Sequence, residues 1–566
     1  MKQPLQRFSH LPYSRADLDE IRHFYTALEK KVTEAASTDD LSALIREEND
    51  YIAQAFAGSD IASIRFYLNT QDIFYRDEYT WWQQAGQEVQ LMGIPFTRLL
   101  LQSPHAQGLE KTYGGLLLPI LNNSLLLQKP EVQELKIAEA NEVREYETLI
   151  SGMRFTIGGK EVGKWESSAY RNNPDRDYRK QAATEISSVL TKHKPRLEAL
   201  YGQLWNNRKT QAEKLGFASP VDFFYSLRNR IGYSREEVAR FYEYSRQYIA
   251  PIRNAEWDKQ KRRMGYDTLY TYDEGFFFSG GYELTNKDPE VTLQRTAEMY
   301  RAISPETDAF FRYLTDYEYL DYKNTPNKAQ IGFATILSAN QSPYIFSILN
   351  GSNFDITVLT HEFGHAFQFS QLPADRLRML GAALAEVAEI HSSSMELITM
   401  PYMSLFFGEQ ANKYNYAVVR RGLDMILDNA LVDHFLEITY SMPEYNAAVM
   451  HEHYATLQRA SRPGIDLSAI DSSREGYGWL MNGHLFSVPF YMIDYALAQM
   501  VSFQWWFEYL ENPELAWQKY LYLCRHAGAD SFTGLVESAG LISPFKEEAF
   551  QKVQTGLTKW FSQQPE

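Results

Sequence analysis

Apolar residues recur at intervals of three and four along most of this 566-residue chain, and this spacing constrains the fold more than any other feature of the sequence. The interval places apolar side chains on one face of an α-helix, so each such segment must pack that face against another element. It predicts helices within residues 16–57, 130–150, 180–216 and 234–263, and again after residue 396. We therefore expect a mainly α protein.

Two segments depart from this interval. Residues 317–355 contain β-branched and aromatic runs separated by Asn, Pro, Ser and Gly, which predicts a small β-sheet. Residues 153–165 place two adjacent glycines between short β-prone runs, which predicts a hairpin. The chain is long enough for several domains. We expect an N-terminal helical lobe over residues 1–190, which includes the hairpin, and a second domain over residues 191–566.

The charge balance limits the classes of partner. The chain has 56 Lys and Arg against 72 Asp and Glu, so its formal net charge is 56 − 72 = −16. Such an excess of negative charge disfavours sequence-independent binding to nucleic acid and to anionic membranes. The most apolar stretch, residues 114–127, is interrupted by Pro119 and is shorter than the ~20 residues that a membrane-spanning helix needs. We expect neither nucleic acid nor a membrane as a partner.

The single cysteine, Cys524, indicates a reducing compartment. One thiol can form neither an intrachain disulfide nor an all-cysteine zinc site. The first twenty residues also lack the apolar core of a secretory signal. We therefore expect a cytoplasmic protein, and we expect any bound metal to be held by histidine and carboxylate side chains.

One short motif carries specific chemistry. After the predicted sheet, the chain reads His361-Glu362-Phe363-Gly364-His365. Four residues advance a helix by about 400°, so the two histidines lie on one face and can bind a single zinc ion. The glutamate, turned by about 100° from the first histidine, can reach a metal-bound water.

The residues around the motif support a helical assignment. Asp355 is a candidate N-terminal cap, and apolar side chains are available to bury the faces that the histidines do not occupy. Gly364 is a poor helix former, so its place inside the motif predicts the close approach of another element or of a substrate.

Catalytic zinc usually has three protein ligands and one position open to water, so a third ligand is needed. The next predicted helix, residues 381–398, supplies the candidates Glu386, Glu389, His391 and Glu396. Glu389 and Glu396 share one helical face with Ser392. A carboxylate on an otherwise apolar helix is costly unless it is paired or coordinating, which predicts a role for at least one glutamate. Position alone does not choose among them.

The sequence HEFGHAFQ, followed downstream by Glu389-Ile390-His391-Ser392, resembles the zinc site of the thimet oligopeptidase and oligoendopeptidase F family of metallopeptidases, which includes Pz-peptidase-like bacterial enzymes. The resemblance implies one zinc ion per chain, bound by His361, His365 and Glu389, with Glu362 as general base. It also implies that Ser392 supports the site, and that Glu386 or Glu396 orients a ligand histidine through its other ring nitrogen.

Residues 476–499 resemble the C-terminal segment of the same family, in which a histidine and the tyrosines that follow it close over the zinc. The corresponding residues here are His484, Tyr491 and Tyr495, and Tyr477 is a further candidate for substrate binding. A neutral histidine and a phenol can both donate to an oxyanion that forms on a zinc-bound carbonyl. Met492 stands where many relatives carry a second tyrosine, which departs from the family pattern.

These features predict a zinc-dependent endopeptidase that hydrolyses internal bonds of short, unstructured oligopeptides, with Glu362 as the proton acceptor. Residues 343–349 are a candidate edge strand for an extended peptide, and Gly332 and Phe346 are candidate contacts. The resemblance implies a two-lobed, helical, zincin-type body with a small sheet beside the zinc helix and a deep substrate channel. It makes residues 191–566 the catalytic metallopeptidase domain.

Two alternatives remain open from the sequence. A helical zinc carboxypeptidase or dipeptidase shares the HExxH motif and requires a free substrate C-terminus. A non-catalytic peptide-binding protein on the same scaffold binds peptides without cleaving them. The sequence does not predict an oligomeric state.

Overall fold

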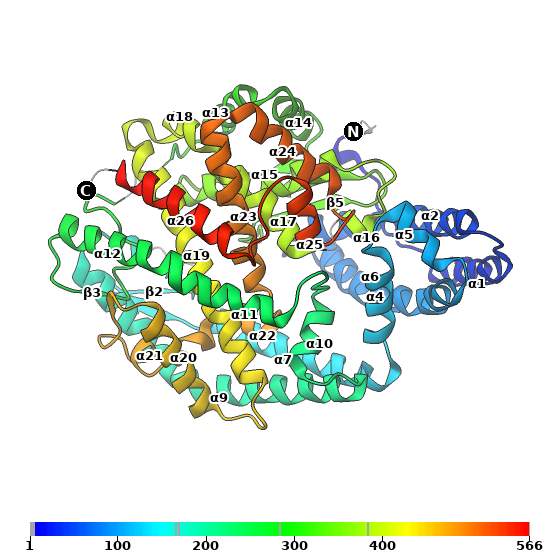
Figure 1. Cartoon of the computed structure of the whole chain (residues 1–566), viewed down its shortest axis with the longest axis horizontal. Coiled ribbons are helices and arrows are strands. Elements are labelled where there is room, and N and C mark those ends of the chain that lie inside the picture. Colours follow the sequence, from blue (N-terminus) through cyan, green and yellow to red (C-terminus); the bar gives the residue numbers. More distant parts are fainter. Residues whose placement is uncertain (1–5, 165–166, 168–169, 282–284, 382–383, 565–566) are drawn as a thin grey trace. The chain divides into compact units, whose positions relative to one another are not determined.

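The computed structural model describes residues 6–164, 167, 170–281, 285–381 and 384–564, and these residues are mainly helical (Figure 1). The prediction of a mainly α fold is confirmed. Within the described residues, no helix is both long enough and apolar enough to cross a membrane.

The chain divides into two compact units, and neither is continuous in sequence. Unit 1 comprises residues 1–128, 283–414 and 505–541, and unit 2 comprises residues 129–282, 415–504 and 542–566. Residue 190, the predicted boundary, lies within a single helix of unit 2, α9 (Arg176–Leu215). The division at residue 190 stays a prediction.

The N-terminal part of unit 1 is helical, as its apolar interval predicts. Its first two helices begin at side-chain caps: Asp17 accepts hydrogen bonds from the first turn of α1, and Ser37 accepts one from the first turn of α2. The helices of this part are α1 (Leu18–Glu34), α2 (Thr38–Ala55), α3 (Ala57–Leu68), α4 (Ile73–Gln102), α5 (Leu109–Tyr113) and α6 (Leu117–Leu127).

Unit 1 contains further helices, and one of them carries the motif. They are α13 (Pro289–Ile303), α14 (Pro305–Asp316), α15 (Asn353–Gln371), α16 (Arg378–Gly381), α17 (Ala385–Thr399), α18 (Ser404–Phe407), α24 (Pro513–His526) and α25 (Phe532–Ser538). Two long helices, α19 (Ala411–Tyr440) and α23 (Met492–Glu511), belong partly to each unit.

Unit 1 also contains the sheet predicted within residues 317–355. Its strands are β4 (Leu320–Asp321), β5 (Phe333–Leu337) and β6 (Ser342–Phe346), in the order β4-β6-β5. β6 pairs in parallel with β4 and antiparallel with β5, and every residue of β6 is buried. The prediction of an edge strand at residues 343–349 is therefore wrong, because β6 is the central strand and β5 lies at the edge.

Unit 2 contains the predicted hairpin, whose strands are β1 (Phe155–Ile157) and β2 (Lys160–Val162). Trp165, at the end of the predicted segment, lies outside the described residues. The other elements are α7 (Gln133–Gly152), α9, α10 (Pro220–Leu227), α11 (Arg235–Tyr244), a π-helical turn (Ser245–Ile249), α12 (Ala250–Met264), β3 (Leu269–Tyr270), α20 (Ala447–Ser461), β7 (Ile465–Asp466), α21 (Asp471–Arg474), α22 (Gly483–Ser487) and α26 (Glu547–Ser562).

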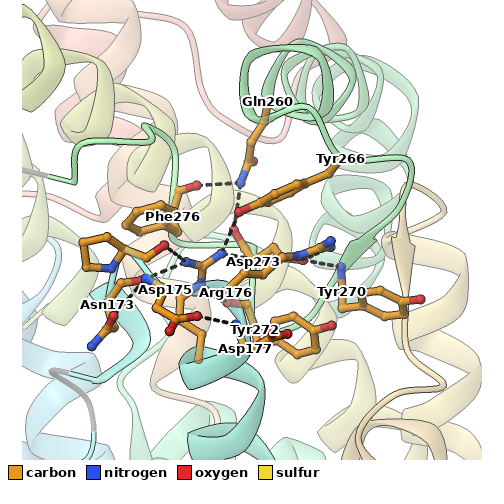
Figure 2. Close-up of polar contacts among 12 residues, drawn as sticks. Asn173, Asp175, Arg176, Asp177, Gln260, Tyr266, Tyr270, Tyr272, Asp273 and Phe276 are labelled. Atoms are coloured by element: carbon orange, nitrogen blue, oxygen red, sulfur yellow. Dashed lines mark hydrogen bonds and ion pairs between the residues drawn. The ribbon is translucent and has the colours of Figure 1, made fainter.

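A buried ion-pair cluster joins the start of α9 to the loop after β3. Nη2 of Arg176 lies 2.7 Å from Oδ2 of Asp273, and Nη2 of Arg179 lies 2.9 Å from Oδ1 of the same carboxylate. Figure 2 shows Gln260 of α12 directed at this loop, where its Nε2 donates to the carbonyl oxygen of Asp273 at 2.7 Å. Because Asp273 is fully buried, each of its oxygens needs such a partner.

Candidate metal centre

The helix that carries the motif, α15, begins with a reciprocal cap. Oγ of Ser352 accepts a hydrogen bond from the backbone N–H of Asp355 at 3.3 Å, and the Asp355 carboxylate accepts one from the N–H of Ser352 at 3.3 Å. The N-cap is therefore Ser352, and the prediction of Asp355 as the cap is wrong. Asp355 is the third helical residue of a capping box, a pattern in which the acidic residue follows the cap by three positions.

Aromatic packing fixes the rotation of α15 about its axis. The ring of Phe363 stacks on Tyr300 of α13 with centroids 3.7 Å apart, and Phe367 stacks on Tyr520 of α24 at 6.2 Å. Because these apolar faces are buried, the opposite face of the helix keeps His361 and His365 partly exposed, at 22% and 16% of their side chains.

Gly364 is the point where α15 and α17 meet. A Cβ atom at this position would lie 2.5 Å from the carbonyl oxygen of His391 and 2.7 Å from Cα of Ser392. No side chain fits in that space, so the predicted close approach of another element is confirmed. Figure 1 shows α17 beside α15, and the contact brings Glu389 to the face that bears the two histidines.

The three predicted metal ligands lie together. Oε2 of Glu389 is 3.4 Å from Nε2 of His361 and 3.6 Å from Nε2 of His365, and one potential ligand atom from each residue falls within 4.8 Å of the others. Tetrahedral zinc with bonds of ~2.0–2.1 Å separates its ligand atoms by roughly 3.3–3.4 Å. The carboxylate oxygen therefore lies at close to the expected distance from each histidine nitrogen, and the three atoms form a set that can hold a metal ion.

Other residues hold these ligand side chains in place. Oε1 of Glu396 lies 2.8 Å from Nδ1 of His361, and His365 is hydrogen-bonded to the backbone of Ala388. Oγ of Ser392 donates to Oε2 of Glu389 at 3.0 Å. Of the two glutamates that the sequence left open, Glu396 contacts a ligand histidine. Glu386 is buried on the same helix.

The electrostatics of the site favour the binding of a cation. Burial opposes the protonation of His361, but its bonds to Glu389 and Glu396 outweigh burial and raise its pKa well above the usual range. Burial alone would raise the pKa of Glu389, yet the two histidines and Ser392 hold it at about 2. Burial lowers the pKa of His365 to about 4, so its imidazole is neutral at pH 7 and has a lone pair for a metal.

Glu362 faces the edge strand. A Cβ atom at Gly332, just before β5, would lie 3.8 Å from Oε1 of Glu362, and the backbone of Ala334 is hydrogen-bonded to the Glu362 carboxylate. Burial, with the negative charge of Glu389 adding to it, raises the pKa of Glu362 to about 7. A carboxylate with a pKa near neutrality can both accept and return a proton. The bond from Ala334 cannot be predicted from residue types, because a backbone donor has no residue signature.

The other predicted substrate contacts are differently placed. Gly332 lies beside Glu362, as described, but the side chain of Phe346 is fully buried in the central strand against Phe333. Tyr477 is buried within unit 2, where its hydroxyl lies 2.8 Å from Oγ1 of Thr191. Direct contact of Phe346 or Tyr477 with a peptide stays a prediction, and packing accounts for both side chains.

His484, Tyr491 and Tyr495 form one aromatic cluster in unit 2. The ring centroids of the two tyrosines are 5.3 Å apart, and those of His484 lie 6.0 Å from Tyr491 and 6.3 Å from Tyr495. All three side chains are partly exposed. The predicted gathering of these residues is observed within the unit, and their predicted role over the zinc stays a prediction.

A helical fold with an HExxH helix, a crossing helix that supplies a third carboxylate ligand and a short sheet beside them defines a metal-dependent peptide hydrolase. Residues 169–552 match peptidase family M3, and residues 8–127 match the peptidase M3 N-terminal domain. The chain belongs to peptidase family M3.

Solved structures of similar proteins match this chain over almost its whole length. The structure of PZ peptidase A with inhibitor 2 has 31% sequence identity and a TM-score of 0.90, and it covers 98% of this chain and 99% of that chain. A protein provisionally assigned as oligoendopeptidase F has 30% identity and a TM-score of 0.90, with 99% of each chain covered. Another, from Bacillus anthracis str. Ames, has 29% identity and a TM-score of 0.86, with 98% of each chain covered. No curated protein matches the chain.

Proposed function

We propose that this chain is a zinc-dependent endopeptidase that hydrolyses internal bonds of short, unstructured oligopeptides and binds one zinc ion. The observation that carries the proposal is the set of ligand atoms of His361, His365 and Glu389, which lie within 4.8 Å of one another, with Glu362 next to the first ligand. A non-catalytic binding protein has no need for a base with a pKa near neutrality beside such a set.

The residues of the chain have separate tasks in this reaction. His361, His365 and Glu389 would hold a zinc ion, which would supply a Lewis acid that lowers the pKa of a water. Glu362 accepts a proton from that water at its carboxylate and returns it to the leaving amine. The outer edge of β5, on the side away from β6, holds the peptide in an extended form through backbone hydrogen bonds. His484, Tyr491 and Tyr495 are proposed donors to the oxyanion, on the strength of the family resemblance.

The substrate class follows from the relatives. The similar structures are those of PZ peptidase A and of two proteins provisionally assigned as oligoendopeptidase F, and the name oligoendopeptidase indicates small peptides as substrates and cleavage at internal bonds. A deep channel that admits flexible peptides and excludes folded proteins is part of the proposal. A cytoplasmic location fits the lone buried thiol of Cys524.

Mass spectrometry of a mixed peptide library and one folded protein, incubated with the enzyme with and without a chelator, tests the proposal. We expect internal cuts that are confined to the peptides and that disappear with the chelator. Removal of one or two residues only from free C-termini would instead indicate the carboxypeptidase or dipeptidase alternative. Stoichiometric peptide binding without any cleavage by the zinc-loaded protein would indicate the binding-protein alternative.

A further inference from the structure

In the part of the chain that the structure describes, a half-buried arginine of unit 2 finds no acceptor for its guanidinium group. Arg228 directly follows α10, and its guanidinium carbon lies 5.3 Å from the ring centroid of Tyr491. Its Nε is buried without a hydrogen-bond partner. Among the described residues, the Arg228 guanidinium forms no hydrogen bond or ion pair, and its ring contact with Tyr491 satisfies none of its five N–H donors.

The backbone fixes the position of this arginine. Asn229 has a φ of +50°, in the left-handed region, and its N–H donates to the carbonyl oxygen of Ser226. The N–H of Arg230 donates to the carbonyl oxygen of Tyr225 at 2.9 Å. These two bonds form a Schellman motif, which ends α10 at Leu227 and holds its C-cap, Arg228, in a defined conformation.

The neighbouring tyrosine is fixed in a related way. Phe490, immediately before Tyr491, has a φ of +64°, which is rare for a bulky side chain. Nη2 of Arg230 donates to the carbonyl oxygen of Phe490 at 2.6 Å and lies 3.2 Å from Oδ1 of the buried Asp433. One buried arginine therefore stabilises the strained residue before Tyr491 and also closes the turn after Arg228. Such over-determined strain is typical of functional sites.

The charge on Arg228 is poorly compensated. Burial lowers the pKa of Arg228, and the like charge of the nearby Arg230 lowers it further. The negative charge of Asp494 acts in the opposite direction. A cation that has lost part of its hydration without gaining an acceptor binds an anion more strongly than an exposed cation does. The planar guanidinium fork matches a carboxylate, with two parallel N–H···O bonds.

We propose that Arg228 binds a carboxylate of the peptide substrate beside Tyr491 and His484. The inference rests on the proposed function and specifies one chemical feature of its substrate. The carboxylate has two sources, the free C-terminus of the peptide or the side chain of an Asp or Glu residue. Both present the same group to the guanidinium, and matched peptides separate them.

The test starts from one peptide that the wild type cleaves. The peptide is made with a free C-terminus and with a C-terminal amide, and the amide is also made as a series in which a single Glu replaces each residue in turn. kcat/KM is measured for the wild type, Arg228→Met, Arg228→Lys and the control Arg240→Met, an exposed arginine of the same unit. We expect the wild type to prefer one carboxylate form by on the order of tenfold, the contribution of a charged hydrogen bond.

In Arg228→Met, that preference falls to about one. The preference is a ratio of kcat/KM values within one protein, so it does not depend on any change in amide cleavage that follows from the contact of Arg228 with Tyr491. Arg228→Lys keeps part of the preference, and Arg240→Met keeps all of it. A preference for the free C-terminus identifies the α-carboxylate, and a preference for one Glu peptide identifies the side chain. Equal kcat/KM values for all forms of the peptide in the wild type would overturn the inference, and so would an unchanged preference in Arg228→Met. Cleavage of the peptides would still support the proposed function in either case.

Calorimetric binding of the same peptides to the chelator-treated wild type and Arg228→Met gives a readout that does not need turnover. The proposed function fails if no peptide is cleaved. In that case, a carboxylate-dependent binding that Arg228→Met abolishes still supports the anion site, and binding that is independent of the carboxylate overturns it. Thermal unfolding of each variant checks that its fold is kept, and Arg228→Lys serves if Arg228→Met does not fold.

Discussion

The carboxylate of Glu396 lies 2.8 Å from Nδ1 of His361, while Nε2 of the same ring faces Glu389 at 3.4 Å. An imidazole presents the lone pair of Nε2 to a metal when its proton is on Nδ1, and a carboxylate acceptor at Nδ1 favours that tautomer. Glu396 therefore fixes both the orientation and the protonation of one ligand without touching the metal position.

Removal of this acceptor should weaken metal binding. We expect Glu396→Ala to lower zinc affinity by about 10–100-fold, the effect typical of a lost carboxylate partner of a ligand histidine. Competition with a chromophoric chelator measures the affinity, and Glu409→Gln, an exposed glutamate of unit 1, is the control. Equal affinities for Glu396→Ala and the wild type would show that His361 is oriented by packing alone.

The contact at Gly364 predicts a large steric effect. In Gly364→Ala, the new methyl would meet backbone atoms of His391 and Ser392 at 2.5–2.7 Å, so α15 and α17 must move apart. We expect a loss of about 1–3 kcal/mol in the free energy of unfolding, measured by urea denaturation, and a weaker zinc site.

Gly86 of α4 is the matched control for Gly364, because a methyl there would meet only a ring carbon of Phe56, at the ordinary distance of 3.7 Å. Gly86→Ala should raise the free energy of unfolding by about 0.5–1 kcal/mol, since alanine loses less backbone entropy in a helix. Destabilisation of similar size in both variants would argue against the close helix contact at Gly364.

The cluster around Asp273 (Figure 2) predicts a second stability effect, in unit 2. Asp273→Asn replaces a carboxylate that accepts from Arg176 and Arg179, and it leaves both cations without their full partner. Loss of one member of a buried ion pair costs about 3–5 kcal/mol. Urea denaturation should show this loss, and Asp267→Asn, at an exposed position just before β3, should be nearly neutral.

The pKa of Glu362 predicts a pH dependence for the metal-free protein. Burial raises this pKa from 4.5 to about 7, so the folded state holds the proton more tightly than the unfolded state does. The contribution of Glu362 to stability is therefore largest below pH 4.5 and is lost as the pH rises toward 7. Glu362→Gln removes this loss.

In chelator-treated protein, we expect Glu362→Gln to unfold at about the wild-type temperature at pH 5 and at a higher temperature at pH 8. The stabilisation should amount to at most about 3.5 kcal/mol, since the pKa differs by about 2.5 units between the two states and each unit corresponds to ~1.4 kcal/mol. A difference between the two proteins that does not change with pH would show that Glu362 titrates normally.

Much of the fold and the centre of the site follow from local sequence patterns. The apolar interval predicts the helices because it reports which face each one buries, and the four-residue spacing of His361 and His365 predicts a shared metal because helical geometry requires it. Gly364 also carried real information, since its missing side chain indicated the crossing of α17.

The rest depends on contacts between distant segments. Both β5 and β6 are apolar, so the sequence does not show that residues 343–349 form the central strand and residues 333–337 the edge. Glu386 and Glu396 lie on the same helix, and only its crossing with α15 decides which of them reaches His361. Arg228 is a single cation after a helix, and its lack of an acceptor is visible only in three dimensions.

The most direct measurement of the central claim is the zinc content and the peptide turnover of Glu362→Gln beside those of the wild type. Glutamine preserves the shape of the side chain but cannot accept the proton, whereas the ligands His361, His365 and Glu389 are untouched. We predict one zinc ion per chain in both proteins, and no detectable cleavage of a peptide that the wild type cuts internally. Turnover at the wild-type rate by the zinc-loaded variant would contradict the assignment of Glu362 as the general base.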